Sequence, residues 1–318
     1  MDRAWGSEVL IWPFPFVIAS GWASPSSSTI EAAILQTIAY ADVFDYPLTV
    51  EEVHRYLVGM PASLAVVRAS LNSAPLSRLL VHRQEFFALP GRASLVTLRR
   101  RRAEVARKMW TRATHYGRMM AALPFVRMVA VTGALAMDNV EPGDDMDYLI
   151  ITEPGRLWLC RALIIVLVKL AARRGDFICP NYLLSERALV FQERTLYTAH
   201  ELTQMVPLAG LTVYHRLRRL NGWTARFLPN AAGPPRSISE ATPLSHPVRA
   251  LAESALRTPL GGWLERWEMQ RKVRKLSRQD GPSEANFCAD WCKGHFQSHG
   301  QHTLEAFTER LRQFEGRT

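Results

Sequence analysis

The chain has 318 residues and a mass of 36.0 kDa, of which 48% are hydrophobic and 21% are charged. This composition is that of a soluble globular protein with room for two domains, and four cysteines are too few for a disulfide scaffold. A reducing, cytoplasmic setting is therefore expected. The net charge of +10 favours polyanionic partners such as nucleotides, nucleic acid or anionic lipid, although arginine-rich solvated helices would give the same charge.

Residues 1–28 contain an apolar run, Val9–Ala19, that two prolines interrupt. A secretory signal would begin with basic residues, whereas the charged side chains here are Asp2, Arg3 and Glu8. We expect a disordered leader rather than a signal peptide.

From Thr29 the pattern becomes regular. Apolar residues recur at helical spacing over Ile30–Ile38. Thr49 with Glu52 three residues later predicts a capping box for a second helix. Ser63–Leu71 predicts a third helix, and Leu79–Leu89 predicts two short strands around a polar turn.

Three short helices followed by a hairpin resemble a winged helix-turn-helix domain, here covering residues 29–95. The resemblance implies binding to DNA through Ser63–Leu71. That segment, however, offers only Arg68 as a strong contact, and the wing adds His82 and Arg83. A protein-interaction or positioning module is the alternative.

The segment Arg99–Met120 predicts a basic helix that opens with the row Arg99–Arg102. Its apolar stripe consists of Val105, Met109 and Ala113. The helix is either a solvated connection, or a positive wall beside a phosphate site or nucleic-acid backbone.

The most informative stretch follows. Val126–Val131 predicts a buried strand, and Gly133 then supplies a sharp turn in which a ligand can approach the backbone. After a loop, Asp145 and Asp147 precede a second apolar strand and share one face, while Met146 faces the core. Two carboxylates this close repel each other unless a cation lies between them, and their oxygens suit Mg²⁺.

A strand, a turn into a short helix, a loop and Asp-x-Asp at the start of a strand resemble the polymerase-β-like nucleotidyltransferase superfamily. Its minimal bacterial members are most similar. The resemblance implies an α/β (α+β) core with a mixed sheet, and transfer of a nucleoside monophosphate from an NTP to an acceptor. It also implies that Asp145 and Asp147 are catalytic and bind Mg²⁺ or Mn²⁺, and that Thr132, Gly133 and Ala134 bind the nucleotide. The acceptor, whether small molecule, protein or nucleic acid, is left open.

The chain departs from this family at two places. Ala134 occupies a position that usually holds Ser or Gly. The expected third carboxylate has no clear counterpart, because the candidate strand Phe177–Leu184 carries Asn181 and has acids only at its ends, Asp176 and Glu186. The alternative function is therefore a weakly active or inactive relative acting as a DNA-binding regulator or antitoxin-like partner.

The rest of the expected core, to residue 230, predicts helices and strands. Leu157–Leu170 is too short and too interrupted for a membrane span and predicts a buried crossover helix. A strand is expected at Ala188–Gln192, and helices at Thr195–Met205 and Leu211–Phe227. Two of the cysteines fall in these buried elements and are expected to be inert thiols, namely Cys160 and Cys179.

Residues 231–318 predict a linker and a helical region, with a basic helix at Leu260–Leu276. On one helix over Phe287–His302, a stripe of metal-ligand types would lie on one face. The stripe consists of Cys288, Cys292, His295, His299 and His302. Three alternatives remain: a zinc site, a lid that brings Lys293 and histidines to a substrate, or a packed amphipathic helix.

Overall fold

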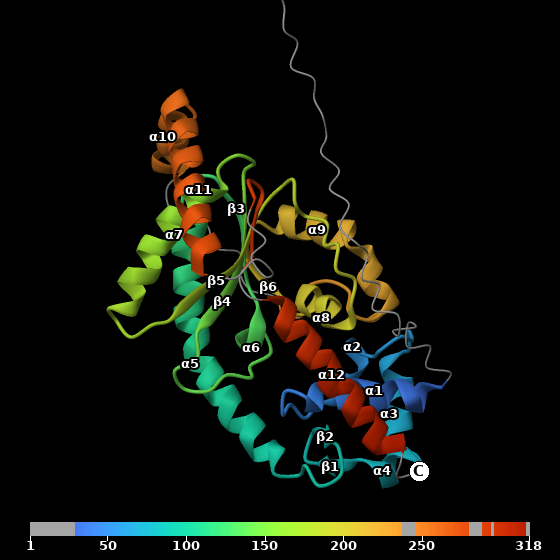
Figure 1. The fold of residues 1–318 in the computed structure, drawn as a ribbon. Coiled ribbons are helices and arrows are strands. Elements are labelled where there is room, and N and C mark those ends of the chain that lie inside the picture. Colours follow the sequence, from blue (N-terminus) through green and yellow to red (C-terminus); the bar gives the residue numbers. More distant parts are fainter. Residues whose placement is uncertain (1–28, 237–245, 280–287, 294–295, 316–318) are drawn as a thin grey trace, which may run out of the picture.

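A computed structural model describes residues 29–236, 246–279, 288–293 and 296–315. Within these ranges the chain forms twelve α-helices, one short 3-10 helix and seven strands (Figure 1). The fold is mixed α/β, as predicted. The expected leader lies outside the described residues.

Five strands form the central sheet in the order β6-β3-β4-β5-β7. They are β3 (Val126–Val131), β4 (Met146–Thr152), β5 (Ile178–Ser185), β6 (Val206–Ala209) and β7 (Trp291–Lys293). β4 and β5 pair in parallel, whereas the other neighbours pair antiparallel, so the predicted mixed sheet is confirmed. A parallel pair needs a crossover, which α7 (Leu157–Ala172) provides.

Helices cover both faces of this sheet (Figure 1), which is why its strands are apolar on both sides. One face packs against α5 (Leu95–Ala121) and α7. The other packs against α8 (Leu196–Gln204), α9 (Leu211–Leu220) and α12 (Phe296–Glu315), with a 3-10 turn at Gly222–Arg226. On β4, Met146 faces the α5 side and Leu149 faces the α8 side. Alternation therefore places Asp147 on the α8 side.

The N-terminal helices and hairpin occur in the predicted order. They are α1 (Ile30–Asp42), α2 (Val50–Arg55), α3 (Leu64–Asn72), α4 (Leu76–Leu79), β1 (Val81–Arg83) and β2 (Phe86–Ala88). The capping box of Thr49 and Glu52 is confirmed, and Leu48 forms a bridge with Phe87 of the hairpin. Arg68, the strong contact expected on α3, is exposed and pairs with Glu51.

These helices share a buried cluster with the sheet. Tyr40 of α1 belongs to the same buried cluster as Met128 and Leu149 of the sheet. At the C-terminal end of α1, the Asp42 carboxylate accepts a hydrogen bond of 2.7 Å from the guanidinium of Arg310 on α12. The N-terminal helices therefore share a core with the α/β part of the chain.

The arginine row on α5 is paired with carboxylates of the chain itself. The pairs are Arg99–Glu52, Arg100–Glu85, Arg101–Glu141 and Arg102–Glu141, with N–O distances of 2.8–3.0 Å. Of the two expectations for this segment, a free positive wall is therefore wrong for these four residues. They join α5 to the N-terminal helices and to the loop before β4.

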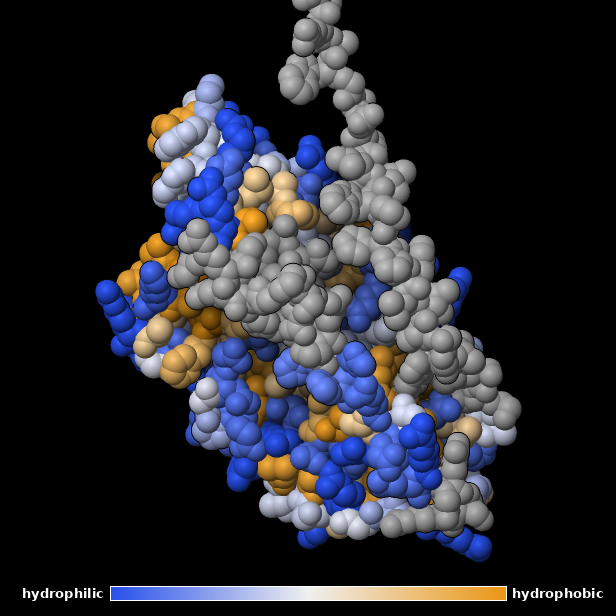
Figure 2. Space-filling view, viewed as in Figure 1, coloured by the Kyte–Doolittle hydropathy of each residue, from blue (hydrophilic) through white to orange (hydrophobic). Residues whose placement is uncertain are grey.

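Two C-terminal helices, α10 (His246–Leu256) and α11 (Pro259–Gln279), pack near α7. Glu265 of α11 accepts hydrogen bonds from the amides of Trp158 (2.9 Å) and Leu159 (2.7 Å) at the first turn of α7. These are amides that a helix leaves unpaired, so Glu265 docks α11 while capping α7. Apolar side chains on the outer side of α7 stay exposed, and orange surface covers it at the left of Figure 2.

Two expected elements are wrong. Ala188–Gln192 forms no strand. The strand β6, which pairs with β3, is not among the expected elements, because its short Pro-containing sequence gives little strand signal. Phe287–His302 is not one helix, because Cys292 lies in β7 and α12 begins at Phe296. β7 satisfies the otherwise unpaired backbone groups along the outer edge of β5.

Among the described residues, no helix is both long and apolar enough to cross a membrane. The apolar helix α7 has only 16 residues and includes Arg161 and Lys169.

Candidate functional site

The turn after β3 lies against Asp147. The amide of Thr132 donates to the carbonyl oxygen of Asp147 over 3.0 Å. Gly133 has φ +64°, and a Cβ placed on it would overlap Oδ2 of Asp147 and lie 3.2 Å from its Cγ. Glycine is therefore required here twice, by the left-handed backbone and by the carboxylate that occupies the space a side chain would take.

Asp145, Asp147 and Cys179 form one cluster whose ligand atoms all lie within 4.8 Å of one another. Asp145 is exposed just before β4, and Asp147 is half-buried in its second position. Cys179 lies opposite Asp147 in the parallel pairing of β4 with β5. The predicted proximity of the two aspartates on one face is thus present, and a thiol joins them.

The electrostatics of the cluster are unfavourable without a cation. Burial, then the charge of Asp145 and that of Asp144, raises the pKa of Asp147 to about 7. Burial and the neighbouring carboxylates also raise the pKa of the Cys179 thiol, so it stays protonated at neutral pH. Among the side chains that the structure describes, no Lys or Arg forms an ion pair with either aspartate.

None of the three positions considered for a third carboxylate joins this cluster. Asp176 is held by Arg112 and by the hydroxyl of Tyr116, over 2.5 and 2.7 Å. The carboxylate of Glu186 lies 3.6 Å from Arg216. Asn181 lies where the pairing of β4 and β5 shifts register. That shift puts Cys179 beside Asp147, and the sequence pattern alone does not reveal it.

The two other predicted nucleotide-binding residues differ in exposure. Thr132 is buried, and its Oγ1 is one of the buried side-chain atoms that find no hydrogen-bond partner within the described part of the chain. Ala134 is exposed. The helix α6 (Gly133–Ala136) has only four residues, so its dipole contributes little to binding an anion.

The donor set fits a hard divalent cation in part. Two carboxylates suit Mg²⁺ or Mn²⁺, which complete their shells with water and phosphate oxygens. A protonated thiol is a poor ligand for these ions, so Cys179 does not replace a third carboxylate. The residues present can therefore supply two protein ligands.

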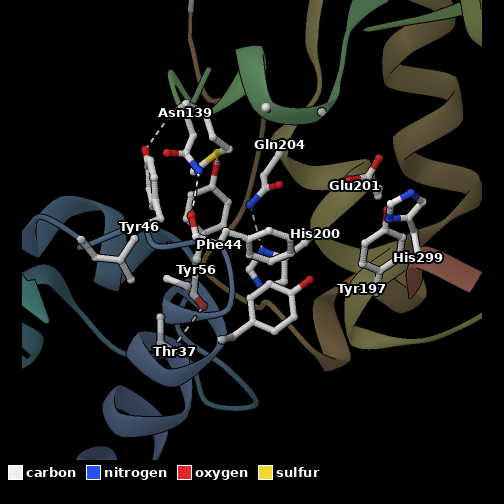
Figure 3. A pocket seen from close by; sticks show the side chains of 16 residues that line it. Thr37, Phe44, Tyr46, Tyr56, Asn139, Tyr197, His200, Glu201, Gln204 and His299 are labelled. Atoms are coloured by element: carbon white, nitrogen blue, oxygen red, sulfur yellow. Dashed lines mark hydrogen bonds between the residues drawn. The ribbon is translucent and has the colours of Figure 1, made fainter. Parts of the chain in front are cut away.

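A cavity of about 340 Å³ adjoins the same turn (Figure 3), and Gly133 and Ala134 form part of its wall. Its other walls come from α1 and the loop after it, from Tyr56 just after α2, from the segment after α6, and from α8 and α12. Most of its rings come from the N-terminal region and α8: Tyr40, Phe44, Tyr46, Tyr56, Tyr197 and His200. No sequence pattern indicates this cavity, because its rings come from segments far apart in the chain.

The C-terminal Cys/His stripe does not assemble as expected. Cys292 is buried in β7, Cys288 is exposed, and His302 lies near Glu305. His299 lines the cavity, whereas His295 lies outside the described residues, as does the side chain of Lys293. Within the described ranges these residues form no group with metal-binding geometry.

The two cysteines expected to be inert differ. Cys160 is buried, as predicted, and its thiol donates to the carbonyl oxygen of Pro124 over 3.3 Å. Cys179 is partly exposed and belongs to the aspartate cluster.

Comparison of the chain with protein-family models, with curated proteins and with solved structures finds no match.

Proposed function

We propose that this protein is a Mg²⁺- or Mn²⁺-dependent nucleotidyltransferase that moves a nucleoside monophosphate from an NTP to an acceptor. The observation that carries the proposal is the pair Asp145 and Asp147, which lacks a cationic partner among the described residues and abuts the Gly133 turn. A protein that keeps two carboxylates this close, with one pKa raised to about 7, gains from a divalent cation between them.

The chemistry follows from this arrangement. A divalent ion held by Asp145 and Asp147 would neutralise charge that develops on the triphosphate. The acceptor oxygen would attack the α-phosphorus and release its proton to water. The bond between the α-phosphorus and the bridging oxygen would break, and pyrophosphate would leave with the electron pair. Gly133 keeps the turn close enough to Asp147 for the phosphates to face both the carboxylates and the backbone.

Labelled transfer tests this proposal. The full chain is incubated with each NTP labelled at the α-phosphate, with Mg²⁺ or Mn²⁺, and with cell extract as a source of acceptor. We expect label transfer with release of pyrophosphate, and a loss of about a hundredfold or more in Asp147→Asn. Extract treated with nuclease or protease, or passed through a small-pore filter, identifies the class of acceptor.

The matched control is Asp144→Asn. It removes the same charge three residues from Asp147, and its amide oxygen can still accept from the Glu141 amide. Transfer should be nearly unchanged. Equal affinity for NTP with and without a divalent ion, measured by calorimetry, would contradict the proposal.

A second candidate is a nucleotide-binding protein of the same architecture without turnover. The specific observation in its favour is Cys179, a protonated thiol beside Asp147 where a third carboxylate would assist catalysis. On this alternative, the chain binds NTP with Mg²⁺ but transfers no label. Binding of duplex DNA through α3 and the hairpin belongs to this alternative, and a gel shift at low salt tests it.

A further inference from the structure

The cavity beside the Gly133 turn has the chemistry of a site for a flat, uncharged ring. Tyr40 and His200 stack at a centroid distance of 4.1 Å and an interplanar angle of 8°, and Tyr56 lies 5.5 Å from His200. Such faces bind planar aromatic ligands without demanding charge. The volume of about 340 Å³ is within the range of small-molecule sites.

One ring nitrogen of His200 in this wall, Nε2, has no hydrogen-bond partner in the described part of the chain. The amide nitrogen of Gln204 lies 3.0 Å from Nδ1 of His200, and because an amide nitrogen only donates, Nδ1 accepts (Figure 3). The neutral ring then carries its proton on Nε2. His200 is only 4% exposed, and its Nε2 has no hydrogen-bond partner within the described part of the chain. An unpaired buried donor costs free energy that a ligand acceptor would recover.

The charges of the side chains that line the cavity determine whether a phosphate or an uncharged ring binds there. No Lys or Arg is among the described residues that line the cavity, and Glu201 contributes a carboxylate. Burial lowers the pKa of His200 to about 3, so this ring is neutral at physiological pH. A phosphate would therefore gain no cation inside the cavity, whereas an uncharged heterocycle meets rings and a donor.

We propose that this cavity binds the base of the nucleotide substrate, with His200 Nε2 donating to an acceptor atom of the base. The inference rests on the proposed function, which places the phosphates at Asp145 and Asp147. Gly133 borders both the cavity and Asp147, so one nucleotide reaches both. Tyr40, Phe44, Tyr46 and Tyr56 give the N-terminal region a direct part in substrate binding.

The test uses free ribonucleosides, which carry a base but no phosphate, with the full chain in EDTA. Binding of adenosine, guanosine, cytidine and uridine at millimolar concentration is measured by ligand-observed NMR. We expect at least one to bind. His200→Phe keeps a ring against Tyr40 but removes the donor, and should weaken that nucleoside about tenfold.

His215→Phe is the matched control, since His215 is exposed on α9 and does not line the cavity. Ala41→Leu places a larger side chain in the cavity wall and should also weaken nucleoside binding. This second variant tests the base site even if His200→Phe does not fold. Melting curves accompany every variant.

The outcomes separate this inference from the proposed function. If no nucleoside binds, or if His200→Phe and Ala41→Leu bind as the wild type does, the base site is wrong. A hydrophobic dye that fills the cavity and that no nucleoside displaces would also overturn it. If nucleosides bind as expected but Mg²⁺ does not tighten the corresponding NTP, the base site stands and the proposed transfer fails.

Discussion

A pair of acids lies near each end of strand β4, Asp145 with Asp147 at its start and Glu153 with Glu253 of α10 beyond its end, and the two pairs have opposite surroundings. Beyond its C-terminal end, Glu153 and Glu253 are bound by Arg127, Arg249 and Arg257. At its N-terminal end, Asp145 and Asp147 have no such partners among the described residues. Within the described part of the chain, only the pair of Glu153 and Glu253 has its charges balanced by arginines.

The pKa values express this difference. Burial favours the neutral form of Glu253, but the Phe125 amide and Arg127 and Arg249 outweigh it and lower the pKa to about 2. Asp147 has burial and like charge acting together, and its pKa rises to about 7. The acid pair that arginines balance therefore differs electrostatically from the pair that we propose binds a cation.

The largest expected effect is an opposite pH dependence of stability at the two ends. The folded pKa of Asp147 exceeds its unfolded value, so its contribution is full below about pH 4 and is lost as pH rises through 7. Between pH 5 and pH 8 in EDTA this loss is on the order of 3 kcal/mol, and Asp147→Asn should remove it. Urea unfolding of both proteins at pH 5 and pH 8 measures the difference.

The folded pKa of Glu253 lies below its unfolded value, so its contribution is present above about pH 4.5 and is lost as pH falls towards 2. Glu253→Gln should therefore lower the free energy of unfolding more at pH 6 than at pH 3. If the free energies of unfolding of the wild type and of Asp147→Asn change in parallel between pH 5 and 8, the two ends of β4 do not differ in this way.

The next effect concerns the third member of the aspartate cluster. Cys179→Asp places a hard oxygen ligand opposite Asp147, and should raise Mg²⁺ affinity about tenfold in the presence of NTP. Cys179→Ser, which adds no charge, is the control. Calorimetric titration with Mg²⁺ decides the matter, and weaker binding in the aspartate variant would show that the thiol, not a carboxylate, suits the bound ion.

The smallest expected effect is that of Gly133→Ala, and comparison with Gly155→Ala distinguishes backbone strain from displacement of the Asp147 carboxylate. Gly133 and Gly155 have φ of +64° and +71°, but a Cβ on Gly155 would meet nothing within 4 Å. Each Gly→Ala change should cost about 1 kcal/mol through φ. Only Gly133→Ala should also displace Asp147 and weaken divalent-dependent NTP binding. Equal Mg²⁺ affinities in the two variants would show that Gly133 serves the turn alone.

The strand–turn–strand unit could be predicted from the sequence because alternation and a single glycine determine it locally. The first helices were predictable for the same reason, since Thr49 and Glu52 cap a helix within one turn. Cys179 could not be predicted as a neighbour of Asp147, because the register shift between β4 and β5 fixes that pairing. In the sequence, His200 resembles any histidine on a half-buried helix. Only the stacking of Tyr40 of α1 on His200 of α8 places it in the cavity wall.

The paired arginines of α5 have a consequence for where the chain can be divided. Arg99 is buried and depends on Glu52 of α2, while Arg101 and Arg102 hold Glu141 in the loop that leads to Asp145. A fragment beginning at the expected boundary near residue 96 would leave a buried guanidinium without its carboxylate. It would also lose the rings that enclose the cavity. A unit that keeps the aspartate loop in place therefore has to include α2, and a truncation series assayed by proteolysis should lose protection of that loop as soon as α2 is removed.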